Sequence, residues 1–285
     1  MDFQWYPGHM TKAKRMMQEN MKLIDIMIEL VDARIPLSSR NPDIDQLAAN
    51  KSRLILLNKT DMADERVTAQ WEEYFKEKGF YVARTNARSG KGVKGTQAIV
   101  MDACKEKLER DRKRGIKNRP IRAMIAGIPN VGKSTFINSL VGKACTKTGN
   151  KPGVTKGKQW IRLNKSVELL DTPGILWPKF EDQEVGMRLA YIGSVKDDIL
   201  NIEELALGLI GYLQEFYPAA IRERYNVEEE LKPLDILTAV AKARGCLKKG
   251  EELDYEKASR LLLEEFRSGK LGKVTLEFPK GPEEA

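Results

Sequence analysis

The sequence has little cysteine and a single histidine among its 285 residues, and this scarcity limits metal and redox chemistry. Its three cysteines, Cys104, Cys145 and Cys246, form no C-x-x-C pair, so neither a zinc site nor a disulfide framework is expected. A long hydrophobic run is also lacking. The longest uncharged apolar stretch in the second half, residues 205–213, has about half the length that a membrane-spanning helix needs. The first ten residues lack the pattern of a secretory signal, and we therefore expect a cytoplasmic protein.

Charged residues, by contrast, are abundant and unevenly distributed, with a net charge of +8. Residues 105–168 contain 17 basic and 4 acidic residues, whereas residues 178–232 contain 6 basic and 12 acidic ones. This reversal predicts a domain boundary near Pro178, which gives domains of residues 1–177 and 178–285. The basic segment 105–119 is either a solvated helix or a nucleic-acid contact, since a basic run alone is weak support for binding.

Strand and helix patterns alternate over the first part of the chain, which predicts an α/β domain with a mostly parallel sheet of about six strands. The expected strands are residues 25–31, 53–57, 80–85, 121–125, 159–163 and 167–170. Helices are expected at residues 11–23 and 93–114, and from Lys133 onward. After Pro178, apolar residues recur at helical spacing, which predicts an all-α C-terminal domain. Its expected helices are residues 185–192, 202–216, 234–243 and 255–266.

Residues 127–134 read GIPNVGKS and match G-x-x-x-x-G-K-[ST] between a predicted strand and a predicted helix. In such a loop, backbone N–H groups surround phosphate oxygens, Lys133 reaches the β- and γ-phosphates, and the Ser134 hydroxyl ligates Mg²⁺. The expected phosphate-binding residues are Asn130, Val131, Gly132, Lys133, Ser134 and Thr135. The sequence therefore predicts a nucleoside triphosphate bound with Mg²⁺.

The tetrapeptide DTPG, from Asp171 to Gly174, follows the last predicted strand. Asp171 is thus expected at a carboxyl edge of the sheet, where it can hold Mg²⁺ through water, and the Gly174 N–H can reach the γ-phosphate. The loop between the two motifs contains Thr155, which is expected to complete the Mg²⁺ shell, with Thr148 as the alternative. We expect Lys133 and Thr155 to contribute to catalysis through these contacts.

The motif Asn58-Lys59-Thr60-Asp61 closes the second predicted strand and selects the base. The Asp61 carboxylate can accept hydrogen bonds from N1–H and the exocyclic amine of guanine. Adenine lacks this donor pair and would leave the carboxylate unpaired, a penalty large enough for strong discrimination. GTP is therefore predicted, and an ATPase is disfavoured.

A second loop, residues 86–89, follows the next predicted strand and is similar to the weaker guanine-contact loop of GTP-binding proteins. It contains Asn86, Ala87 and Arg88. The Ala87 N–H would meet O6 of the base, and the Arg88 side chain would lie along the base. The pattern of this loop is short and is weak support for a guanine contact by itself. It is interpreted as one because the guanine motif at Asp61 is present.

Together these motifs resemble those of the translation-factor-class GTPases, but their order is rotated. The guanine motifs at 58–61 and 86–89 precede the phosphate loop at 127–134, so the chain resembles a circularly permuted GTPase. Such a rotation is physically tolerable because the termini of compact domains lie close together. With residues 5–10 (WYPGHM) and 174–180 (GILWPKF), the chain resembles the bacterial ribosome biogenesis GTPase A family over essentially its whole length.

The resemblance implies GTP hydrolysis coupled to late assembly of the large (50S) ribosomal subunit. The helical domain resembles RNA-binding helical modules of the family, so we expect it to bind rRNA or pre-50S particles, including ribosomal proteins. Because the D-x-x-G motif leads directly into this domain, we expect the binding to depend on GTP. We also expect a monomer. Two alternatives remain open: a GTP-sensing RNA-binding scaffold with little hydrolysis, and a GTPase directed to tRNA. The helical domain itself can also be interpreted as a packing domain only.

The position directly after D-x-x-G, which holds a water-orienting glutamine in many related GTPases, is Ile175 here. Isoleucine cannot polarise water. His9, the only histidine, is the expected substitute because imidazole accepts a proton near neutral pH; a structural or exposed histidine is the other interpretation. Related GTPases with asparagine at the position of Asn130 hold K⁺ with its amide oxygen, so the resemblance also implies K⁺, unless Asn130 only shapes the loop.

Overall fold

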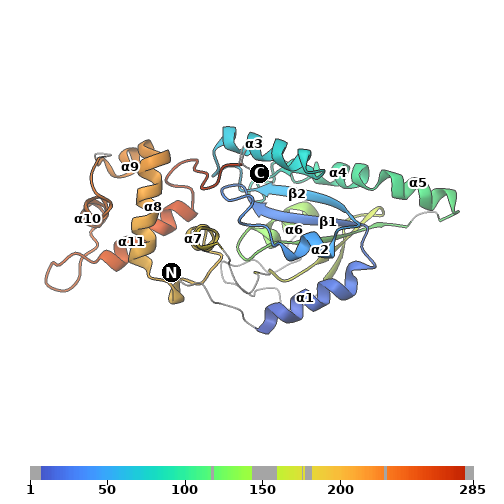
Figure 1. Cartoon of the computed structure of the whole chain (residues 1–285), viewed down its shortest axis with the longest axis horizontal. Coiled ribbons are helices and arrows are strands. Elements are labelled where there is room, and N and C mark those ends of the chain that lie inside the picture. Colours follow the sequence, from blue (N-terminus) through green and yellow to red (C-terminus); the bar gives the residue numbers. More distant parts are fainter. Residues whose placement is uncertain are drawn as a thin grey trace.

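The computed structural model of the chain describes residues 8–116, 119–142, 159–174, 176, 182–227 and 230–279. A six-stranded sheet with the order β3-β2-β1-β4-β6-β5 lies in one half of the elongated molecule (Figure 1). The strands are β1 (Ile26–Asp32), β2 (Ser52–Asn58), β3 (Tyr81–Arg84), β4 (Ile121–Ala126), β5 (Gln159–Arg162) and β6 (Val167–Asp171). Among the described strands, only β5 is antiparallel to its neighbour. The predicted six-stranded, mostly parallel sheet is confirmed.

The central strands are buried on both faces, which explains their near-continuous apolar sequences. Every residue of β1 is buried, as are the last five residues of β2. The one acidic residue inside β1, Glu29, forms ion pairs with Arg40 and Arg53. A charge in this position is tolerated because its partners neutralise it and bond to it.

Six helices accompany the sheet in the described residues: α1 (Gly8–Met21), α2 (Asp43–Leu47), α3 (Glu65–Glu77), α4 (Thr96–Ala103), α5 (Lys105–Lys113) and α6 (Lys133–Val141). The single helix predicted over residues 93–114 is wrong, because Cys104 leaves helical geometry at φ −105° and ψ 8°. Here α4 packs on β2 and β3, whereas α5 buries no residue and extends beyond the sheet (Figure 1). Cys104 is buried at this change of direction, and burial raises the pKa of its thiol to about 12.

The second half of the chain is helical, as the sequence predicts. Its helices are α7 (Gln183–Tyr191), α8 (Ile202–Phe216), α9 (Pro218–Tyr225), α10 (Pro233–Ala243) and α11 (Tyr255–Arg267), with a 3₁₀ turn at Asp197–Ile199. Helix α8 packs against α9, α10 and α11 and buries Leu205, Leu209 and Leu213. None of the described helices is long and apolar enough to span a bilayer. These helices gather at the end of the molecule opposite α5 (Figure 1).

After α11 the chain returns to the sheet domain as a segment that we call the C-terminal strap, residues 271–278. Its backbone N–H groups at Val274 and Leu276 donate to the carbonyl oxygens of Met62 (3.0 Å) and Arg34 (2.8 Å). The Trp71 indole N–H donates to the carbonyl oxygen of Glu277 (2.8 Å). The strap therefore joins the helical part to the loops that follow β1 and β2.

Candidate nucleotide-binding site

The phosphate loop connects β4 to α6, and its glycines are fixed by close approaches as well as by conformation. Gly132 is the N-cap of α6 with φ +96°, in the left-handed region that favours glycine. A Cβ at Gly132 would lie 2.6 Å from Asn58 Nδ2, and one at Gly127 would lie 2.7 Å from the carbonyl oxygen of Leu30. The loop therefore lies directly against the ends of β1 and β2, and it places Lys133 and Ser134 in the first turn of α6.

Lys133 Nζ forms an ion pair with Asp171 Oδ1 at the end of β6. Both side chains are buried; burial lowers the pKa of Lys133, and the carboxylate opposes that shift. The structure thus brings together the predicted phosphate lysine and the predicted Mg²⁺ carboxylate, from motifs 38 residues apart in sequence.

The donor set fits Mg²⁺. Asp171 Oδ2 is buried and has no hydrogen-bond partner among the described residues, so one carboxylate oxygen remains to be satisfied. Mg²⁺ is usually bound by one or two protein oxygens together with substrate phosphates and water. Asp171 and the Ser134 hydroxyl would hold it here, and the bound ion would offset charge on the phosphates. The described residues contain no cluster of three His, Cys, Asp or Glu side chains that could hold a metal alone.

The segment after Asp171 passes the phosphate loop closely. The Thr172 hydroxyl donates to the carbonyl oxygen of Ile125 (2.9 Å), which fixes the segment on β4. A Cβ at Gly174 would lie 3.1 Å from the backbone nitrogen of Pro129, so glycine permits this approach. The predicted γ-phosphate contact, Gly174, thus lies beside the phosphate loop.

Asn58, the first residue of the guanine motif, joins three segments. Its Nδ2 donates to the carbonyl oxygen of Val131 (2.8 Å) in the phosphate loop. Its Oδ1 accepts from the Ala87 N–H (3.0 Å) in the second guanine loop and from the Thr85 hydroxyl (3.2 Å) just before that loop. One buried amide therefore sets the distance between the phosphate and base sites.

Lys59 likewise connects the guanine motif to the phosphate loop and to the end of β1. Its ammonium donates to the carbonyl oxygen of Asn130 (2.7 Å) and pairs with Asp32 Oδ2 (2.9 Å). Burial lowers the pKa of Lys59, and Asp32 counteracts part of this effect. For Asp32, burial would raise the pKa, but Arg34 and Lys59 outweigh it and hold the pKa well below its usual range. Asp32 therefore remains charged near neutral pH.

The remaining residues predicted to contact guanine follow β2 and β3. Asp61 is exposed after β2, and the Thr60 hydroxyl donates to the carbonyl oxygen of Thr85 (3.2 Å). Asn86 Oδ1 accepts from the Arg88 N–H (3.0 Å), so this asparagine shapes its own turn. The Ala87 N–H, which the sequence predicts as a donor to the base O6, is used by Asn58, so a bond to O6 requires that partner to be exchanged.

Asn130 has a contact that its sequence position did not indicate. With φ 64°, its amide donates to the carbonyl oxygen of Gly193 (2.6 Å), just after α7. Next to it, the Ser194 hydroxyl donates to the carbonyl oxygen of Pro129 (2.7 Å). The phosphate loop is therefore bonded to the helical part at two adjacent points. Because Gly193 and Ser194 carry no motif, sequence reasoning had no signal for them.

Some predicted positions lie outside the described residues: Thr148, Thr155, Ile175 and the segment 177–180. The backbone of His9 belongs to α1, but its side chain is also outside them. Their roles in water activation and in the metal shell stay predictions.

The fold and the site together define a P-loop GTPase. Its guanine motifs follow β2 and β3, its phosphate loop follows β4, and all face the same carboxyl edge of the sheet, so the circularly permuted order predicted from the sequence is confirmed. The family model described as "50S ribosome-binding GTPase" matches residues 122–238. The chain belongs to the ribosome biogenesis GTPase A family.

Similarity to these relatives extends over nearly the whole chain. The ribosome biogenesis GTPase A of Bacillus cereus is 53% identical over 281 residues, which cover 98% of this chain and 95% of the relative. That of Thermotoga maritima is 36% identical and covers 97% and 94%, respectively. Among solved structures, GDP-bound YlqF is 29% identical, with a TM-score of 0.67 over 94% of this chain and 100% of the other. A GNP-bound YlqF from T. maritima gives a TM-score of 0.66 at 31% identity, over 94% of this chain and 99% of the other.

The geometry fits GTP binding, because it places the predicted phosphate and guanine residues at one edge of the sheet. In this structure the Lys133 ammonium is held by Asp171; phosphate oxygens in the loop would compete for the same ammonium. Asp61 stays the predicted acceptor for guanine, and Lys59 bonds the guanine motif to the phosphate loop. Phosphoryl transfer depends mainly on such positioning and charge stabilisation.

Proposed function

We propose that this chain hydrolyses GTP as an assembly factor for late maturation of the large (50S) ribosomal subunit. It would act as a cytoplasmic monomer and bind rRNA in pre-50S particles in a GTP-dependent way. The observation that carries the proposal is the 53% identity to a ribosome biogenesis GTPase A over 98% of this chain, because that match includes the helical part as well as the GTPase site.

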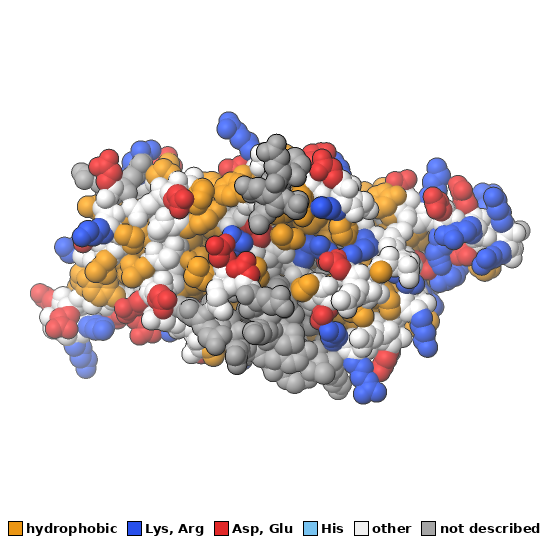
Figure 2. All heavy atoms as spheres, in the orientation of Figure 1, with side chains coloured by type: hydrophobic (Ala, Val, Ile, Leu, Met, Phe, Trp, Pro, Cys, Tyr) orange, Lys and Arg blue, Asp and Glu red, His pale blue; other side chains and the backbone are white. Residues whose placement is uncertain are grey.

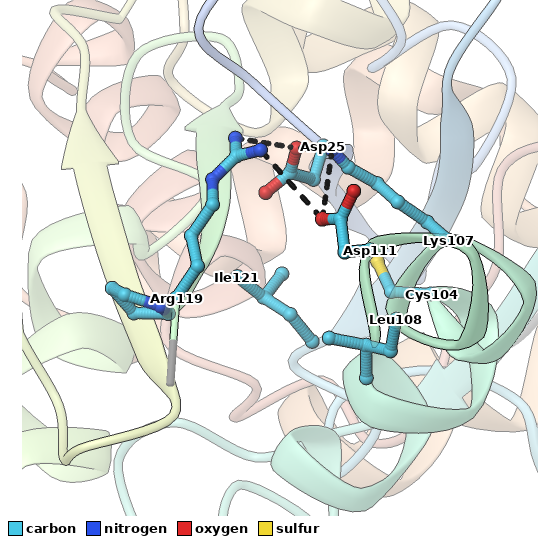
Figure 3. A pocket seen from close by; sticks show the side chains of 8 residues that line it. Asp25, Cys104, Lys107, Leu108, Asp111, Arg119 and Ile121 are labelled. Carbon is cyan, nitrogen blue, oxygen red and sulfur yellow. Dashed lines mark hydrogen bonds and ion pairs between the residues drawn. The ribbon is translucent and has the colours of Figure 1, made fainter. Parts of the chain in front are cut away.

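Helix α5 supports an RNA contact on the GTPase part. Ion pairs connect α5 to residues outside the helix. Lys107 of α5 lies 2.6 Å from Asp25, and Arg119 lies 3.2 Å from Asp25 and 3.7 Å from Asp111 of α5 (Figure 3). Together with the buried Cys104, these contacts hold α5 in one orientation without help from a core of its own.

The outer surface of α5 carries basic side chains that this network does not use. They are exposed and form no ion pair with any described residue: Arg110, Arg112, Lys113 and Arg114. Figure 2 shows Lys and Arg gathered at this end of the molecule. Exposed cations without an ion-pair partner among the described residues suit the phosphate backbone of RNA. This favours the nucleic-acid interpretation of segment 105–119 over a merely solvated helix.

GTP dependence is supported by the contacts between the phosphate loop and the helical part. Gly174, the predicted γ-phosphate contact, lies beside Pro129, and the carbonyl oxygen of Pro129 is bonded to Ser194. Asn130 adds the bond to Gly193. A change at the γ-phosphate can therefore reach the residues that follow α7 through two bonds, which fits a switch that orients the helical part.

For hydrolysis we propose that His9 positions the attacking water and that Thr155 completes the Mg²⁺ shell. His9→Ala should then lower kcat while leaving GTP affinity unchanged, and an unchanged kcat would refute this role. We further propose K⁺ at Asn130. The Asn130 amide nitrogen donates to the carbonyl oxygen of Gly193, and its amide oxygen is the proposed K⁺ ligand. Hydrolysis should be faster in KCl than in NaCl, and equal rates would remove K⁺ from the account.

The partner is tested by sedimentation with purified large subunits. Binding should be stronger with a non-hydrolysable GTP analogue than with GDP, and excess small subunits or tRNA should not compete. The double variant Arg112→Glu/Lys113→Glu should weaken binding, whereas the matched charge reversal Arg66→Glu/Lys78→Glu, in α3 and at its C-cap, should not. Competition by tRNA would support the alternative of a tRNA-directed GTPase.

A further inference from the structure

Asp32, at the end of β1, is a fully buried carboxylate that holds two cations. Arg34 donates to both of its oxygens, with Nε at 2.9 Å from Oδ1 and Nη2 at 2.8 Å from Oδ2. The Lys59 ammonium lies 2.9 Å from Oδ2. Neither Asp32 nor Arg34 belongs to a guanine or phosphate motif, so their role is not explained by base or phosphate recognition.

Arg34 extends from this carboxylate to the helical part. Its third nitrogen, Nη1, donates to the carbonyl oxygen of Phe266 (3.3 Å) in the last turn of α11. The guanidinium also lies over the Phe266 ring, 5.1 Å from its centroid. The Arg34 carbonyl oxygen accepts from Leu276 of the C-terminal strap (2.8 Å). The Arg34 side chain is 1% exposed, so water cannot easily replace any of these partners.

On the other side, Lys59 continues the same series into the phosphate loop, where its ammonium donates to the carbonyl oxygen of Asn130 (2.7 Å). The order of contacts is therefore Asn130, Lys59, Asp32, Arg34 and Phe266. Lys59 and Arg34 share the Asp32 carboxylate. Lys59 also donates to a carbonyl oxygen in the phosphate loop, and Arg34 donates to one in α11. In a buried network of this kind, removing one member leaves its neighbours unsatisfied, so the members act together.

We propose that Asp32 and Arg34 are positioning residues that fix Lys59 for guanine nucleotide binding and couple that binding to the packing of α11. The coupling is reciprocal: a nucleotide that orders the Lys59 loop also stabilises the end of α11, and contacts that hold α11 raise nucleotide affinity. The inference depends on guanine nucleotide binding and not on a ribosomal partner.

The test uses the full chain, a fluorescent GDP analogue and hydrogen exchange over residues 262–278. Arg34→Lys keeps the charge but cannot donate to both Asp32 oxygens and to Phe266 at once. It should weaken GDP binding about tenfold, the scale of one charge-assisted hydrogen bond. It should also abolish the slowing of exchange at residues 262–278 that GDP produces in the wild type.

Arg224→Lys is the matched control. Arg224 forms the same two-pronged contact (2.8 and 2.7 Å) to Glu265, the neighbour of Phe266 on α11, but it has no link to Lys59. It should leave GDP affinity and GDP-dependent protection at wild-type values. Wild-type behaviour of Arg34→Lys would overturn the proposal, and so would equal losses in both variants, since these would indicate a general loss of stability.

A second variant keeps the proposal testable if Arg34→Lys does not fold. Phe266→Leu preserves an apolar side chain and leaves Asp32 and Lys59 intact, but it removes the ring beneath Arg34. It should weaken GDP binding about threefold, in line with a modest cation–π contact. Unchanged affinity would overturn the coupling. Because no ribosome is present, these results do not depend on the proposed ribosomal function.

Discussion

Replacing Asn58 with alanine should separate the phosphate and base sites. The change removes three hydrogen bonds and leaves the Val131 carbonyl, the Ala87 N–H and the Thr85 hydroxyl without this partner in a buried place. At about 1 kcal/mol for each bond, the loss is about 3 kcal/mol. This loss is divided between the free energy of folding and the free energy of GDP binding. Each 1.4 kcal/mol of binding free energy is about tenfold in affinity, so we expect GDP binding to weaken by at least tenfold.

The assay is equilibrium titration with a fluorescent GDP analogue, with urea unfolding measured on the same samples. Asn201→Ala is the control, because it removes one asparagine cap bond, to the Glu204 N–H (3.2 Å), at the start of α8. The control should lose about 1 kcal/mol of unfolding free energy and no GDP affinity. If Asn58→Ala binds GDP as tightly as Asn201→Ala, then Asn58 does not organise the site and the reasoning is refuted.

Three further predictions concern a loop glycine, a buried ion pair and the base. Gly132→Ala should weaken GDP binding at least tenfold, because the added Cβ would lie 2.6 Å from Asn58 Nδ2. Gly142→Ala is the control: this glycine also has a positive φ, but an added Cβ would meet no atom within 4 Å, so the variant should lose only about 1–2 kcal/mol of stability and no GDP affinity. Hydrogen bonds from Arg224 lower the pKa of Glu265 to about 2, so its contribution is present above pH 4.5 and lost as pH falls toward 2. Glu265→Gln should lower the free energy of unfolding in urea by about 1–3 kcal/mol at pH 7, less than the full pKa shift implies because the arginine partners are partly exposed. It should also flatten the dependence of unfolding free energy on pH below 4.5, and an unchanged dependence would contradict this assignment. Asp61→Asn should shift nucleotide preference from GTP toward XTP in competition binding, and retained GTP preference would contradict the base assignment.

The sheet could be predicted closely because its buried strands carry continuous apolar runs. The helix break at Cys104 could not, since helical spacing continues on both sides and the change of direction comes from packing α4 on the sheet while α5 leaves it. The C-terminal strap has no strong pattern either. Its position is set by bonds such as that from the Ser38 N–H to Glu277 (3.0 Å), across 239 residues of sequence.

The motifs of the site were predictable because phosphate and guanine impose fixed residue types at fixed spacings. The supporting contacts were not, because they depend on tertiary neighbours. Asp32 carried one usable signal: it directly follows a predicted strand, as Asn58 follows the next one, and side chains at such positions meet at one edge of a parallel sheet. Gly193, which receives the Asn130 amide, carried none.

We propose that this GTPase acts on the large ribosomal subunit. The most direct test is the GTP hydrolysis rate of the purified chain in KCl with and without large subunits, using small subunits and tRNA as controls. We expect strong stimulation by large subunits alone. No stimulation, or equal stimulation by tRNA, would contradict it.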